Sequence, residues 1–114
     1  MTQEQENLLL KDLCARLPYG VILNCCEIVS EPLTLISYKG LVNNDYDIDE
    51  VKPYLFPLSS MTEEQNLEYL STCRGGNSYC PTSKTFDWFD KNHFDYRDLI
   101  PMGLALDATG LNIY

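Results

Sequence analysis

Positive charge is scarce in this sequence of 114 residues. Eight lysines and arginines stand against 17 aspartates and glutamates, so the formal net charge is −9 and the isoelectric point is about 4.3. A protein that binds nucleic acid directly needs a surplus of lysine and arginine to replace the counterions of the phosphates. We therefore expect no direct binding of nucleic acid, and we expect an unknown protein partner with a basic surface.

Long apolar segments are also missing. The longest apolar runs have three or four residues, such as Leu8–Leu10, whereas a membrane-spanning helix needs ~20 apolar residues and a signal peptide has an apolar core of ~7–15. We therefore expect no contact with a membrane and a cytoplasmic location.

Histidine and paired cysteines are too few for a recognisable metal site. His93 is the single histidine, and the cysteines are Cys14, Cys25, Cys26, Cys73 and Cys80. A structural zinc site takes four nitrogen or sulfur ligands, commonly with C-x-x-C spacing, which does not occur here. An odd number of cysteines leaves at least one thiol free even under full oxidation. We expect buried thiols in a reducing compartment, with no metal and no cofactor.

The carboxylates Asp45, Asp47 and Asp49 open like a calcium-binding loop. The pattern then departs from that loop, because Glu50 stands at its sixth position, where glycine makes the turn, and Phe56 stands at its twelfth, where glutamate binds the ion. An acidic, solvated edge is the favoured interpretation.

The hydrophobic content of 45% is typical of a globular protein, and the length predicts one domain over residues 1–114. Thr2 and Gln5 form a capping box for a helix up to residue 17, with Leu9, Leu10, Leu13, Cys14 and Leu17 on its apolar face. Residues 19–28 and 33–38 are rich in β-branched and aromatic residues, which predicts two antiparallel strands.

Further strands are expected around residues 41–48 and at 51–55, where Pro53 favours an edge or a strand end. Thr62 and Gln65 predict a second helix, which carries Leu67, Leu70 and Cys73 on one side and stops at Gly75–Gly76. A third helix is expected over residues 82–92, and the apolar tail 94–114 is expected to be ordered.

These elements predict an α+β fold. It has an N-terminal helix, a small antiparallel sheet of three or four strands, two further helices and an ordered C-terminal tail. A partly open SH3-like barrel is one option for the sheet.

The densest unusual feature is the aromatic and acidic block 86–98. Its candidate interaction surface consists of Trp88, Asp90, His93, Asp95 and Tyr96, because tryptophan and tyrosine are enriched at protein interfaces. Aromatic residues at this spacing are more often part of a core, and Phe86 and Phe89 are expected there. Asp90 and His93 are three apart, which could orient an imidazole for acid–base chemistry.

Three long, ungapped stretches, residues 15–21, 50–65 and 86–114, resemble a family of small uncharacterised proteins from gut Bacteroides-type bacteria and their phages and prophages. His93–Ile100 matches the signature of that family, except that Asp98 stands where glycine is usual. If the glycine serves a special backbone angle, aspartate is a tolerable but strained replacement. The resemblance implies a phage- or mobile-element-related protein of a bacterial host cell, and it implies no catalytic residue.

The favoured function is a non-enzymatic protein-interaction module with a basic partner. One alternative is a mimic of nucleic-acid charge that inhibits a DNA-binding protein of the host. Another is a small enzyme or metal protein that uses Asp90 and His93. The sequence names neither the partner nor the oligomeric state.

Overall fold

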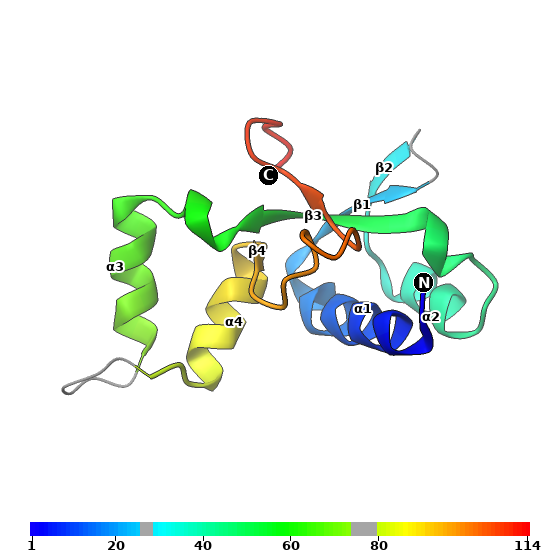
Figure 1. Ribbon diagram of the computed structural model, residues 1–114, viewed down its shortest axis with the longest axis horizontal. Coiled ribbons are helices and arrows are strands. Elements are labelled where there is room, and N and C mark those ends of the chain that lie inside the picture. The colour runs from blue at the N-terminus through cyan, green and yellow to red at the C-terminus, as the bar shows by residue number, and fades with distance from the viewer. Residues whose placement is uncertain (26–28, 74–79) are drawn as a thin grey trace.

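The computed structural model describes residues 1–25, 29–73 and 80–114, and their arrangement is α+β (Figure 1). The helices are α1 (Gln3–Arg16), α2 (Leu35–Val42), α3 (Glu63–Thr72) and α4 (Ser83–Lys91). The strands are β1 (Ile22–Cys25), β2 (Val29–Pro32), β3 (Val51–Pro57), β4 (Phe94–Asp95) and β5 (Leu106–Asp107). Within the described ranges, no helix has the length and apolar character needed to cross a membrane.

The molecule is elongated, with a longest extent of 47 Å. Helices α3 and α4 form an arm at one end, and α2 and β2 lie at the other end (Figure 1). The hydrophobic core lies between these ends, where α1 and α2 pack with the sheet and the C-terminal tail. It includes Leu9, Leu13, Leu23, Leu41, Leu55 and Leu99.

The sheet is open and mixed, with the strand order β2-β1-β3-β4 and with β5 also paired to β3. Strand β1 pairs antiparallel with β2 and with β3, whereas β4 and β5 join β3 in parallel, so the sheet is mixed and not antiparallel throughout as expected. The described strands therefore do not close into an SH3-like barrel.

Strand β3 is central, although Pro53 predicted an edge strand or a strand end. Pro53 lies opposite Leu23 of β1, and pairing on the other side of β3 begins only at Tyr54, with β5. Proline has no backbone N–H to donate, and at Pro53 only β1 is paired with β3 among the described residues, so no hydrogen bond to β5 is lost there.

Helix α1 confirms the predicted capping box. The Thr2 hydroxyl accepts from the Gln5 N–H, and the Gln5 side chain accepts from the Thr2 N–H. Leu9 and Leu13 are fully buried as predicted, but Cys14 is exposed. Asp12 and Arg16 are the buried polar residues of this helix, because they take part in an ionic cluster described below.

The prediction of a strand over residues 33–38 is wrong, because Leu35 starts helix α2. Thr34 and Ser37 form a capping box in which each backbone N–H donates to the other residue's hydroxyl. Leu41 is buried on this helix. The strand that pairs with β1 is instead β2. The strand expected around residues 41–48 is wrong as well, because residues 41–42 end α2 and a loop leads from there to the 3-10 turn Ile48–Glu50.

Helix α3 begins at the predicted capping box of Thr62 and Gln65, and α4 begins at a capping box of Thr82 and Thr85 that was not predicted. Helix α3 contributes no buried residue, and Leu67, expected on its packed side, is 68% exposed. The predicted helix stop at Gly75–Gly76 lies outside the described residues.

The tail 94–114 is folded against β1 and β3. Asp98 has a φ of 59°, the left-handed conformation that glycine adopts without strain. The Tyr114 hydroxyl accepts from the Ile22 N–H at 2.8 Å and donates to the Tyr54 carbonyl at 2.7 Å, which joins β1 to β3 where their ladder ends.

Candidate functional site

The structure divides the five residues of the candidate interaction surface. Asp90 and Asp95 are buried, at 4% and 5% exposure, whereas Trp88, His93 and Tyr96 are partly exposed. The two carboxylates therefore point into the protein and serve internal contacts.

Asp90 belongs to an ionic cluster that joins α1, α4 and the tail. The cluster consists of Asp12, Arg16, Asp90, Tyr96 and Arg97. Arg16 Nε donates to Asp12 at 2.8 Å and lies 4.0 Å from Asp90, while Arg97 donates to the other oxygen of Asp12 at 2.7 Å. The Tyr96 hydroxyl donates to Asp90 at 2.8 Å. Two arginines and two aspartates thus balance each other inside the protein.

Arg16 is the centre of this cluster and is fully buried. Its Nη2 donates to the carbonyl oxygen of Phe94, which fixes the start of β4. Both guanidinium groups lie at cation–π distance from the ring of Tyr96, with Arg16 Cζ 5.4 Å and Arg97 Cζ 4.4 Å from the ring centroid.

Burial raises the pKa of the Asp90 carboxyl, while the hydrogen bond from Tyr96 and the charges of Arg16 and Arg97 lower it. Burial, followed by the hydrogen bond and the charge of Asp90, raises the pKa of the Tyr96 hydroxyl. For both groups burial outweighs the opposing charges of the arginines, so the pKa of each lies above its ordinary value.

Asp95 caps the turn that follows β4. Its two carboxylate oxygens accept from the N–H groups of Leu99 and Ile100, each at 2.9 Å. This carboxylate therefore orders the first part of the tail.

His93 is not paired with the Asp90 carboxylate. It has a φ of 64° and stacks on Tyr114, with ring centroids 3.7 Å apart. Its Nδ1 is buried and has no hydrogen-bond partner among the described residues. Burial first, and then the charge of Arg16, lower the pKa of the imidazole to about 4, so it is neutral at pH 7. Among the described residues, no hydrogen bond or ion pair joins the His93 imidazole to the Asp90 carboxylate, as the acid–base alternative from the sequence requires.

Trp88 is part of an aromatic cluster that attaches α3 to α4. Its ring stacks on Phe94 at 5.4 Å, and its Nε1 donates to Glu68 of α3. Phe89 is buried as predicted and stacks on Tyr69 of α3 at 5.4 Å. Phe86, predicted in the core, is 43% exposed because it lies at the rim of this cluster.

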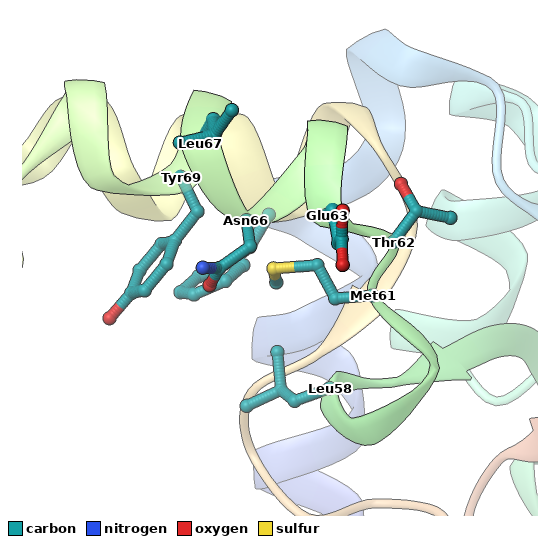
Figure 2. Close-up of a pocket in the computed structure, with 8 residues that line it drawn as sticks. Leu58, Met61, Thr62, Glu63, Asn66, Leu67 and Tyr69 are labelled. Carbon is teal, nitrogen blue, oxygen red and sulfur yellow. The ribbon is translucent and has the colours of Figure 1, made fainter.

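A groove runs along the arm where α3 meets the turn that precedes it. We call it the arm groove. It has a volume of about 690 Å³. Figure 2 shows Leu58, Met61 and Asn66 gathered around its opening, with Tyr69 further along. Most of these side chains are apolar, and the groove also reaches Phe89 of α4.

A second recess lies at the opposite end of the molecule, beside α2. We call it the α2 pocket, and its volume is about 570 Å³. Carboxylates from β2 and from the loop before β3 surround an apolar floor. The sequence reasoning missed this pocket because it assigned the first residues of α2 to a strand. The Thr34–Ser37 capping pattern was the signal that could have placed it.

Within the described ranges, no group of three or more histidine, cysteine, aspartate or glutamate side chains could hold a metal ion. The carboxylates of Asp45, Asp47 and Asp49 accordingly form no common ligand set, and the Asp47 side chain instead accepts from the Asp49 N–H. Comparisons of the chain with models of protein families, with curated proteins and with solved structures find no match. The similarity to the Bacteroides and phage family therefore stays a prediction.

Proposed function

We propose that this protein is a non-enzymatic interaction module that binds an apolar segment of a basic protein in the arm groove. The observation that carries this proposal is the incomplete packing of α3. This helix contributes no buried residue, yet with the preceding turn and α4 it lines an apolar groove of about 690 Å³. Helices in proteins gain most of their stability by burying an apolar face, and here Tyr69 packs on Phe89 while Leu67 stays 68% exposed.

The exposed leucines at the groove allow an estimate of the free energy that a partner would gain by covering them. Leu67 is 68% exposed and Leu58 is 41% exposed. Full burial of a leucine side chain contributes ~1.5–3 kcal/mol. A partner that completed the burial of both side chains would therefore gain ~2–3 kcal/mol from these two residues.

The charge of the arm supports a basic partner. Helix α3 carries Glu63, Glu64 and Glu68 and no lysine or arginine, and the chain as a whole has a net charge of −9. Such a surface accelerates encounter with a positively charged protein and repels a second copy of the same chain. The resemblance to phage and prophage proteins supports a partner in a bacterial cell.

The proposal is tested by affinity capture with variants of the groove. Leu58→Asp and Leu67→Asp each place a charge at the groove, and Leu111→Asp is the matched control, since Leu111 is 49% exposed and is not among the groove residues. All three variants must keep the wild-type circular dichroism spectrum. We expect a basic protein to be retained by the wild type and by Leu111→Asp, and to be lost from both groove variants.

The captured partner is then purified, and its affinity for the wild type and for each variant is measured directly. If the groove variants hold the same proteins as the wild type with unchanged affinity, the arm groove is not the binding site.

A further inference from the structure

The α2 pocket has an apolar floor. Leu23, Leu41 and Val51 line it from β1, α2 and β3, and all three belong to the hydrophobic core. Ile36 of α2 is also part of the lining and is 79% exposed. The floor can therefore contact an aliphatic chain, and the exposed Ile36 adds apolar surface that a bound group would cover.

The rim of the pocket is acidic. Four carboxylates line it: Glu31, Asp45, Asp47 and Glu50. The described residues that line the pocket include no lysine, arginine or histidine. Glu31, Asp45 and Asp47 have no ion-pair partner in the described part of the chain. Among the described side chains, the negative charges of these three carboxylates are therefore not neutralised by an ion pair.

The backbone at Asp45, one part of this rim, is held against helix α2. The N–H groups of Asp45 and Tyr46 both donate to the carbonyl oxygen of Gly40, at 2.8 and 3.3 Å. The Tyr46 ring lies so close to Gly40 that a Cβ on that residue would overlap it. This part of the rim therefore loses little conformational freedom when a ligand enters.

We propose that the α2 pocket receives a lysine or arginine side chain from an exposed segment of a partner protein. The aliphatic stem of such a side chain packs on the apolar floor, while its charged head reaches the carboxylates of the rim. Hydrogen bonds between a cationic head and carboxylates are the stronger kind. A purely apolar group would leave the carboxylates unmatched, and an anion would be repelled.

This inference goes beyond the proposed function, because it concerns a separate site. The arm groove and the α2 pocket lie at opposite ends of the molecule (Figure 1). Variants of one site leave the other intact, so the two proposals can fail independently.

The test is an NMR titration of the ¹⁵N-labelled protein with a seven-residue glycine–serine peptide that carries one central arginine. The control peptide carries citrulline, which has nearly the same shape without the charge. We expect the arginine peptide to shift the amide signals of Leu23, Ile36 and Leu41 in a saturable way, while signals of α3 stay in place. The citrulline peptide should bind at least about tenfold more weakly, the size expected for a charged hydrogen bond.

Paired variants separate the pocket from general electrostatic attraction. Glu31→Gln with Asp45→Asn removes two charges from the rim, and Glu64→Gln with Asp87→Asn removes two charges from the arm. We expect the first pair to weaken binding of the arginine peptide about tenfold and the second pair to leave it nearly unchanged.

The proposal would be overturned by equal weakening from the two pairs of substitutions, by equal binding of the arginine and citrulline peptides, or by the absence of shifts at the pocket amides. Tighter binding of spermidine than of the peptide would also overturn it, because the pocket would then be a site for a free polyamine.

Discussion

Replacing Arg16 by methionine is expected to destabilise the protein by about 3–5 kcal/mol, because Arg16 holds the ionic cluster together. Methionine keeps much of the apolar stem of this fully buried side chain. The substitution removes the hydrogen bonds that Arg16 donates to Asp12 and to the Phe94 carbonyl. It also removes the positive charge that lies close to the Asp90 carboxylate. Each hydrogen bond to a charged group contributes ~1.5–3 kcal/mol, and relief from burying the guanidinium offsets part of the loss.

The remaining contacts place the loss toward the lower part of that range. Asp12 keeps its hydrogen bond from Arg97 at 2.7 Å, and Asp90 keeps the one from Tyr96 at 2.8 Å. In the Arg16→Met variant, Asp12 still pairs with Arg97, whereas Asp90 keeps only the neutral Tyr96 hydroxyl as a hydrogen-bond partner among the described residues. A second substitution, Asp90→Asn, removes this unbalanced negative charge. The double variant should therefore recover at least about 1 kcal/mol relative to Arg16→Met alone.

Urea denaturation of the wild type, the two single variants and the double variant gives the free energies of unfolding and their coupling. A loss below about 1 kcal/mol for Arg16→Met, or no recovery in the double variant, would refute the view that charge balance around Arg16 stabilises this fold.

Three further predictions concern other positions. The pKa of His93 is lowered to about 4 in the folded protein, so between pH ~6.5 and ~4 the unfolded chain binds more protons than the folded one. The free energy of unfolding should therefore fall as the pH falls through that window. His93→Asn, which fits the positive φ, should flatten this dependence in urea titrations at several pH values. Asp98→Gly should raise the melting temperature because it relieves a φ of 59°, whereas Asp98→Ala, which gains no such freedom, should not; equal effects of the two would contradict the strain. Leu13→Ala should cost ~2–5 kcal/mol in denaturant unfolding because the side chain is fully buried, and Leu70→Ala should cost clearly less because Leu70 is partly exposed.

The helices with strong local signals could be predicted from the sequence. The capping patterns at Thr2 and Thr62 predicted the beginnings of α1 and α3, and a helix over residues 82–92 was also expected where α4 lies. Helix α2 has the same signal at Thr34, but it has only eight residues, includes Gly40, and begins in a segment with strand-like composition. Short apolar segments of this kind do not distinguish a helix from a strand by pattern alone.

The candidate site depended on contacts between distant parts of the chain, which the sequence pattern does not report. Asp90 is buried because Arg16 and Tyr96 meet it, and Arg16 reaches the Phe94 carbonyl across 78 positions of sequence. The aromatic density of the block 86–98 correctly predicted that Phe89 is buried, but Phe86, expected beside it in the core, is 43% exposed. Which acidic residues turn inward was decided by those distant partners.

Site-specific photo-cross-linking in cells tests the central claim, that the arm groove binds a basic protein, most directly. A benzoyl-phenylalanine replaces Leu58 at the groove or, as a control, Leu111 away from it. The account predicts that irradiation links position 58, and not position 111, to one protein through a segment in which apolar residues lie beside lysines or arginines. Adducts of the same protein at both positions, no adduct at position 58, or a link to a second copy of this chain would contradict it.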